Sequence, residues 1–311
     1  IRYNASCSTE QDLEKWEYSL LRKTHTVEKG LSLRNPRVGF GQQKVSALLD
    51  ELARYQQRFG QEHPEYFRMD KNGVRTPVQN FCVSAPDAMK IVCARAVELA
   101  RRLYGSTHRY YFWLDDVWGD GGCKCADCAK LTASDQQLVY LNAVVAALRR
   151  EIPDASVAYL AYHGTMSVPQ KIKPADGVFL EFAPINRDMT KPFCVQNASE
   201  LRNVQSLLSF FGKERARVLE YWFDNSLFSK WKKPEKKFVP QADVFASDVA
   251  WYAERGFGEI ASFACFLGPG YERQWGTPDV SPMTVDRAVS LRGLYSSQGG
   301  RDATAAEVRL G

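Results

Sequence analysis

SVAYLAY (Ser156–Tyr162) and GVFLEFAP (Gly177–Pro184) are two apolar runs separated by a short link. Both are almost continuously hydrophobic rather than alternating, which is typical of parallel strands covered on both faces. The link between them contains Pro169 and Pro174 within residues 166–176. Prolines disfavour a helix interior, so we expect these two strands to be joined with little helix. The stretch therefore indicates an α/β protein with one irregular connection.

The same alternation of apolar runs and amphipathic stretches continues on both sides of this segment. Helices are predicted after most runs, with capping residues or proline at their starts and glycine at their ends. One begins at Ser84 and Pro86 and ends at Gly105, and another begins at Ser134, which forms a capping-box pattern with Gln137. Further helices are predicted at about 200–211 and 241–255. The strand candidates are residues 1–6, 36–41, 76–84, 108–115, 156–162, 177–184, 217–224 and 259–268.

These eight strand candidates, with helices after most of them, predict a (β/α)8 TIM-type barrel that is irregular around its fifth and sixth strands. A doubly wound sheet is less favoured because no GxGxxG fingerprint follows the first strand. We expect the barrel to occupy residues 1–282. Residues 283–311 lack a clear strand or a long apolar face, so we interpret them as a tail rather than a separate domain, with a final barrel helix as the alternative.

The composition narrows the classes of partner. The chain has 311 residues, is 45% hydrophobic and carries a formal net charge of +5. Its one dense basic run, KWKKPEKK (Lys230–Lys237), is interpreted as a solvated loop, because nucleic-acid binding usually uses a broader basic face. No run of about 18 uncharged apolar residues is present, so no membrane-spanning segment is expected. The chain does not begin with a signal peptide; a removed leader or a missing upstream domain would account for that.

The candidate catalytic residues are two adjacent carboxylates, Asp115 and Asp116, at the end of the apolar run YYFWLDD. Reactive groups of barrel enzymes stand at the carboxyl ends of strands. Two neighbouring carboxylates separate each other's pKa values, which suits substrate-assisted cleavage of a 2-acetamido sugar. In that mechanism one carboxylate orients the acetamido group and the other protonates the leaving oxygen. The alternative is that both residues cap the glycine-rich turn that follows.

Other strand ends supply candidate substrate-binding residues. Tyr162 is a candidate hydrogen-bond donor to the acetamido carbonyl, and His163 follows it. Glu181 lies in an apolar run, where a buried carboxylate needs a partner or a ligand. The remaining candidates are Asp224 and Asn225, for gripping sugar hydroxyls, and Trp222, for stacking. Each has a structural alternative. Tyr162 would be a tyrosine at the edge of the core and His163 a surface histidine; Asp224 and Asn225 would form an ordinary turn, and Trp222 would lie in the core. Trp231 and Trp275 are further candidate stacking platforms.

Three cysteines follow the acid pair closely. Cys123, Cys125 and Cys128 form C-x-C-x-x-C, which lacks the second CxxC of a paired zinc motif. We therefore predict no metal and no cofactor, and keep a metal site at these three residues as the alternative. Its fourth ligand would be Cys82 or His163, both expected at the same face of the barrel. A disulfide within the loop, or free thiols, is the simpler interpretation.

Several blocks of the chain resemble a known bacterial family. They are HPEYF (63–67), FCVSAPD (81–87), LDDVWGDGGCKCADC (114–128), SDQQLVYLNAV (134–144), AYLAYHGT (158–165) and VFLEFAPINRD (178–188). Their order and spacing are similar to the family called domain of unknown function 4838, part of which is glycoside hydrolase family 163, endo-acting β-N-acetylglucosaminidases on N-glycans. The resemblance implies a hexosaminidase-like barrel, a retaining mechanism through an oxazoline, a glycan or glycoprotein substrate, and a secreted, periplasmic or cell-surface location.

By that resemblance Asp115 would orient the acetamido group and Asp116 would be the acid/base. One departure is that related hexosaminidases often have glutamate at the acid position, one methylene longer. Two other functions stay open from the residues. The first is a two-carboxylate glycosidase on other sugars, using Asp116 with Glu181 or Asp224, and the second is a catalytically silent carbohydrate-binding barrel. The exact glycan, endo or exo action and oligomeric state are not fixed by the sequence.

Overall fold

The computed structural model describes residues 60–75, 80–103, 108–114, 119, 121–263, 265–267 and 269–283. The chain divides into two compact units. Unit 1 comprises residues 1–6 and 181–311, and unit 2 comprises residues 7–180. The boundary falls inside a strand, β3 (Val178–Phe182), so one continuous strand contributes to both units.

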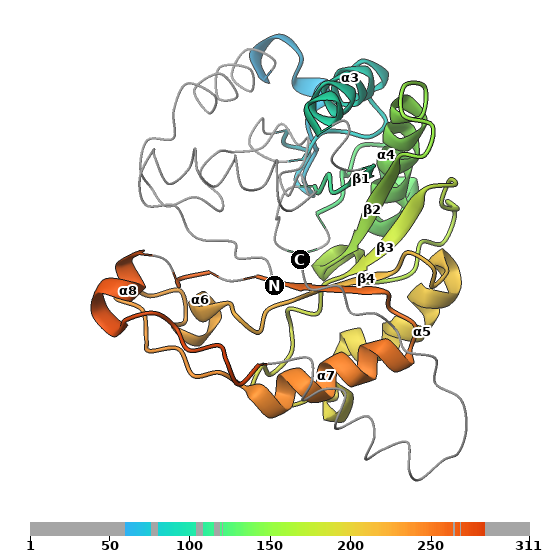
Figure 1. The fold of residues 1–311 in the computed structure, drawn as a ribbon. Helices are drawn as coiled ribbons and strands as arrows, with labels where there is room; N and C mark the ends of the chain where they lie inside the picture. The colour runs from blue at the N-terminus through green and yellow to red at the C-terminus, as the bar shows by residue number, and fades with distance from the viewer. Residues whose placement is uncertain are drawn as a thin grey trace, which may run out of the picture. The chain divides into compact units, whose positions relative to one another are not determined.

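The described strands form one sheet in chain order (Figure 1). They are β1 (Arg109–Tyr110), β2 (Ser156–Ala161), β3, β4 (Arg217–Glu220) and β5 (Glu259–Ser262). The β1–β2, β3–β4 and β4–β5 pairs are parallel. Five strands in sequential order with helices between most of them confirm the α/β class and the parallel sheet, whereas a closed eight-stranded barrel stays a prediction.

The two strands that the opening sequence predicted are present, and their connection has the expected character. All five residues of β3 are buried, and only one residue of β2 is partly exposed. Between them the chain forms only a short 3-10 turn, η4 (His163–Thr165). Side chains of helix α4 (Ala133–Leu148) satisfy backbone groups of this link. The Asp135 carboxylate accepts from the backbone N–H of Lys171 at 2.8 Å and of Ile172 at 3.0 Å.

The third strand candidate, residues 76–84, is wrong in its described part. Phe81 forms an isolated antiparallel bridge with Phe67 instead of joining the parallel sheet. The backbone explains this pairing, because Cys82 N–H donates to the Tyr66 carbonyl at 2.8 Å and Arg68 N–H donates to the Asn80 carbonyl at 2.8 Å. The candidates at residues 1–6 and 36–41 lie outside the described residues.

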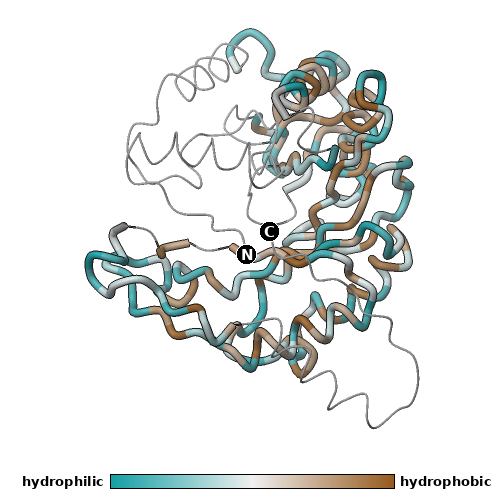
Figure 2. Tube along the Cα trace, viewed as in Figure 1, coloured by the Kyte–Doolittle hydropathy of each residue, from teal (hydrophilic) through white to brown (hydrophobic). Residues whose placement is uncertain are grey.

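Two helices, α3 (Pro86–Leu103) and α4, pack against each other in unit 2, and α4 also covers β2. Their hydrophobic and polar residues alternate along the trace (Figure 2). The capping box of α4 is formed by Thr132 and Asp135, not by Ser134 and Gln137 as the sequence suggested. Ser134 instead lies in the first turn, where its hydroxyl donates to the Ser167 carbonyl at 2.6 Å.

Unit 1 carries the helices predicted after β3 and β4. Helix α5 (Ser199–Phe211) ends at Gly212, whose φ of 83° favours glycine, and α7 (Ala242–Glu254) is followed by Gly256 at φ 89°. Its shorter elements are η5 (Phe193–Val195), α6 (Asn225–Phe228) and α8 (Pro269–Trp275); those of unit 2 are η2 (Pro64–Tyr66) and η3 (Cys128–Lys130). Among the described residues, no helix combines the length and hydrophobicity needed to span a bilayer. Residues 284–311, most of the predicted tail, lie outside the description.

Candidate functional site

The predicted acid pair, Asp115 and Asp116, lies outside the described residues, but the run that leads to it is described. Tyr111 and Phe112 are buried, and Tyr111 packs with Ala158 and Phe179. The hydroxyl of Tyr140, on α4, donates to the Phe112 carbonyl at 3.2 Å. The apolar run before the two aspartates is therefore buried as expected, and the catalytic role of the pair stays a prediction.

Tyr162 and His163 follow β2 directly, at its carboxyl end. Both are half-buried, and their ring centroids lie 4.1 Å apart. His163 has a positive φ of 44°, which is uncommon for a residue with a side chain. The Thr165 hydroxyl holds the turn, since it donates to the Leu160 carbonyl at 2.7 Å. The two rings therefore have defined positions next to the end of β2. Their role in substrate binding stays a prediction.

Glu181 has the internal partner that a buried carboxylate requires. Its Oε1 lies 3.1 Å from Nε of Arg217, and both side chains are almost completely buried. Arg217 also reaches Glu259 at 3.3 Å. The three residues are cross-strand neighbours on β3, β4 and β5, so the ion pairs form a row across the parallel strands. The ion pair with Arg217 already accounts for the buried carboxylate. A sugar contact by Glu181 stays a prediction.

A second buried ionic network in unit 1 was not predicted from the sequence. The Arg187 guanidinium lies 2.7 Å from Glu220 through Nη1 and 2.7 Å from Asp248 through Nη2, and all three side chains are fully buried. Tyr252 donates its hydroxyl to Glu220. The indole N–H of Trp222 donates to Asp248 at 2.9 Å. We refer to Arg187, Glu220, Asp248, Trp222 and Tyr252 as the Arg187 network.

The Arg187 network shifts the protonation of its carboxylates. Burial raises the pKa of Glu220 to about 7, against the opposing attraction of Arg187. Burial also raises the pKa of Asp248, while Arg187 and hydrogen bonds act in the other direction. Glu220 lies between Leu219 and Tyr221 in an apolar run, the same signal that singled out Glu181. Arg187 and Asp248 come from distant parts of the sequence and gave no local signal.

Asp224 and Asn225 begin the short helix α6. The Asp224 side chain accepts from the backbone N–H of Ser226 at 3.0 Å, and burial raises the pKa of Asp224. The side-chain amide of Asn225 donates to the Lys236 carbonyl at 2.8 Å. Both residues are buried, so in this conformation they stabilise the turn after β4, and their sugar-binding role is still a prediction.

The candidate tryptophans separate by exposure. Trp222 is 3% exposed and its indole N–H already has an acceptor, whereas Trp231 is 65% exposed and Trp275 is 40% exposed. The Trp275 indole donates to the Glu235 carbonyl at 3.0 Å, which fixes its orientation at the surface. Of the three, Trp231 and Trp275 therefore present the accessible ring area that stacking on a sugar would need, and Trp222 has a core position.

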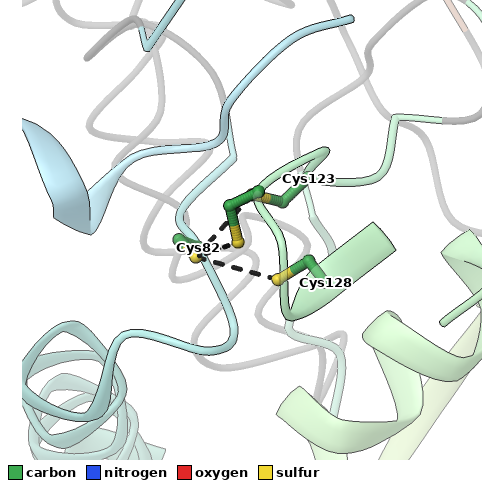
Figure 3. Close-up of side chains that lie close together, drawn as sticks. Cys82, Cys123 and Cys128 are labelled. Carbon is green, nitrogen blue, oxygen red and sulfur yellow. Dashed lines mark hydrogen bonds between the residues drawn. The ribbon is translucent and has the colours of Figure 1, made fainter. Parts of the chain in front are cut away.

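Four cysteines come together in unit 2. The Sγ of Cys82 lies 3.7 Å from Cys123, 3.6 Å from Cys125 and 3.7 Å from Cys128. All four sulfur atoms lie within 4.8 Å of one another, and His163 is not part of the group. Figure 3 shows Cys82 approaching Cys123 and Cys128 from a separate chain segment. No disulfide joins any described cysteines. We call this group the four-cysteine cluster.

Comparison with known proteins identifies the family. Residues 16–261 match the family described as domain of unknown function (DUF4838), so the chain belongs to this family. No curated protein matches it.

Two solved structures align weakly with the chain. One is a GH5-4 broad specificity endoglucanase from an uncultured bacterium, with 13% identity, 79% of this chain and 76% of that chain covered, and a TM-score of 0.41. The other is a glycoside hydrolase family 5 enzyme from Prevotella bryantii B14, with 12% identity, 81% and 78% covered, and a TM-score of 0.37.

Proposed function

We propose that this protein is a glycoside hydrolase that cleaves at a 2-acetamido sugar, with Asp115 and Asp116 as its catalytic residues. The observation that carries the proposal is the parallel register of β1 and β2, in which Arg109 pairs with Ser156 and Tyr110 with Val157. Carboxyl ends of parallel strands meet at one edge of a sheet, where barrel enzymes place their reactive groups.

In the sequence, Asp115 and Asp116 follow Tyr110 at the same intervals at which Tyr162 and His163 follow Val157, so we propose that the acid pair reaches the same edge as the two rings. The contact of Tyr111 with Ala158 follows the same one-for-one spacing. Two carboxylates and two aromatic rings would then share one edge within unit 2. Such a group offers hydrogen-bond acceptors for sugar hydroxyls and amides, together with ring faces for the apolar side of a pyranose.

The proposed reaction is substrate-assisted and proceeds with retention of configuration. Asp115 accepts a hydrogen bond from the acetamido N–H and directs the acetamido oxygen to the anomeric carbon. As that C–O bond forms, the glycosidic C–O bond breaks and Asp116 gives its proton to the leaving oxygen. Water then opens the ring, an oxazolinium ion whose N–H stays hydrogen-bonded to the Asp115 carboxylate, while Asp116 takes a proton back. Tyr162 is proposed to donate to the acetamido carbonyl.

The test is hydrolysis of an N-glycopeptide panel, followed by mass analysis of the products. Removal of a general acid typically lowers the rate by about 10²–10⁴-fold, so we expect a loss of this size for Asp116→Asn. A thiazoline analogue of N-acetylglucosamine should inhibit the wild-type protein strongly. Asp127→Asn is the control, because that carboxylate is exposed and pairs with Lys130 in the same turn.

Full activity of Asp116→Asn would overturn the assignment of the acid. Hydrolysis of sugars without an acetamido group, insensitive to the thiazoline, would point to a two-carboxylate glycosidase instead. Calorimetric binding of glycans without turnover after prolonged incubation would identify a carbohydrate-binding protein. The predicted secreted, periplasmic or cell-surface location follows from the family resemblance and belongs to this proposal.

A further inference from the structure

The three distances from the Cys82 sulfur to the other sulfur atoms of the four-cysteine cluster match the geometry of a tetrahedral metal site. A zinc–thiolate bond is about 2.3 Å long, so two sulfur ligands of one tetrahedral zinc ion lie about 3.8 Å apart. The three distances from Cys82 to the other sulfur atoms are 3.6 Å, 3.7 Å and 3.7 Å. A disulfide requires about 2.0 Å, so none of these pairs is covalently joined.

We propose that Cys82, Cys123, Cys125 and Cys128 bind one zinc ion in a structural site. Four thiolates fill a tetrahedral coordination shell, which leaves no position for water or substrate. Soft sulfur ligands in tetrahedral geometry favour zinc or iron over magnesium and calcium. On binding, Zn²⁺ replaces the thiol protons and the four sulfur atoms become thiolates, so the occupied site carries two net negative charges.

Two neighbouring groups are placed to stabilise this negative charge. The backbone N–H of Met69 donates to Sγ of Cys123 at 3.3 Å, and the hydroxyl of Ser84 lies 3.0 Å from Sγ of Cys128. Hydrogen bonds of this kind fix the orientation of metal ligands. The Met69 N–H thus donates to one sulfur of the cluster, and the Ser84 hydroxyl is within donating distance of a second once Cys128 is a thiolate.

The backbone around the sulfur atoms is held by a buried side chain of α4. Gln136 is 4% exposed, and its Oε1 accepts from the Cys123 backbone N–H at 2.8 Å. Its Nε2 donates to the Cys123 carbonyl at 3.1 Å and to the Cys128 carbonyl at 2.9 Å. Gly122 makes room for this contact, because a Cβ there would lie 3.2 Å from the Gln136 amide. Gln136 therefore holds the backbone of two of the four cysteines in place.

A second chain segment completes the arrangement. The Lys124 backbone N–H donates to the Met69 carbonyl at 2.8 Å, and Arg68 Nε donates to the Gly122 carbonyl at 3.0 Å. Cys82 belongs to the strand-like segment that pairs with Phe67 and lies just before α3. A zinc ion at this position would join the segment before α3 to the loop before α4.

The first experiment measures metal in the whole protein, produced with zinc in the medium and purified under reducing conditions without chelator. Elemental analysis should give about one zinc per chain. The Cys128→Ser variant should hold at least tenfold less. Cys93→Ser is the matched control, since Cys93 lies on α3 of the same unit and outside the cluster; it should retain the wild-type zinc content.

A second measurement covers the case in which Cys128→Ser does not fold. The wild-type protein is stripped of metal and titrated with Co²⁺ alone, whose visible spectrum distinguishes tetrahedral thiolate from octahedral oxygen coordination. A tetrahedral tetrathiolate spectrum at one equivalent supports the site. The proposal is overturned by an octahedral spectrum, by no uptake of Co²⁺, by iron in place of zinc, or by mass analysis showing disulfides among the four residues in the freshly purified protein.

Discussion

The Arg187 network of unit 1 and the four-cysteine cluster of unit 2 both gather acidic groups in the protein interior, but they differ in where the compensating cation comes from. In the network, the guanidinium of Arg187 lies 2.7 Å from each of two carboxylates. In the cluster, all four converging atoms are thiol sulfurs. The buried carboxylates of the network already have a positively charged partner within the protein. The cluster contains only sulfur ligands, and we propose that its cation comes from solution.

The largest effect is expected from removing the internal cation. Arg187→Met leaves Glu220 and Asp248 buried without their partner, and breaking a buried ion pair in this way costs about 3–5 kcal/mol of unfolding free energy. Denaturant unfolding of the variant and the wild type measures the difference. The zinc content of the variant should not change, because the two groups belong to different units. A loss below about 1 kcal/mol would mean that the carboxylates find other compensation.

The pH dependence of stability sharpens the comparison. The folded-state pKa of Glu220 is raised from 4.5 to about 7 by burial, so the folded protein binds this proton more tightly than the unfolded chain does. The resulting stabilisation is fully present below about pH 4.5 and is lost as the pH rises through about 7. The decrease should be smaller than the effect of Arg187→Met, because the guanidinium partner remains.

The check is the free energy of unfolding measured between pH 4.5 and 7 for the wild type and for Glu220→Gln. The variant should show a flatter profile in this window. Asp248, whose pKa is raised in the same direction, keeps part of the slope. A profile that is equally steep in both proteins would contradict the assignment to Glu220.

A smaller loss is expected for the ion-pair row on the strands. Glu181→Gln removes one charge from the row, but Arg217 keeps its contact with Glu259. We expect the unfolding free energy to fall by less than the about 3–5 kcal/mol of a broken buried ion pair, because Arg217 keeps a charged partner. Asp87→Asn, in an exposed pair with Lys90, should cause no measurable change. A loss for Glu181→Gln as large as that for Arg187→Met would show that Glu259 does not compensate.

The sequence predicted what depends on local pattern. The strands at β2 and β3, the helices α5 and α7 with their terminal glycines, and the absence of a long helix between β2 and β3 were all expected. The cap of α4 was misplaced by two residues, because serine is the more favoured capping residue and only the backbone shows that Thr132 accepts the N–H. The segment with Phe81 has the composition of a strand, but it pairs with the chain near Phe67. Composition does not predict which segment a strand pairs with.

The candidate site residues also divide into those that local sequence pattern predicted and those that only the fold brings together. Burial of Glu181 in an apolar run implied a partner, and the structure supplies Arg217. The same reasoning applies to Glu220, yet its partners Arg187 and Asp248 are brought to it only by the fold. For the cysteines, the local C-x-C-x-x-C pattern gave three members, and the choice between Cys82 and His163 as the fourth needed the pairing of residues 66–68 with 80–82. The acid pair itself remains a prediction.

The carboxylate of Asp135 has a consequence for engineering. It accepts from the backbone N–H and the hydroxyl of Thr132 in the capping box of α4, and also from the backbone N–H groups of Lys171 and Ile172 in the link between β2 and β3. The conformation of this link therefore depends partly on helix α4. A graft that exchanged the link alone, without α4, would lose the anchor that replaces a crossover helix, so the two should be transplanted as one module.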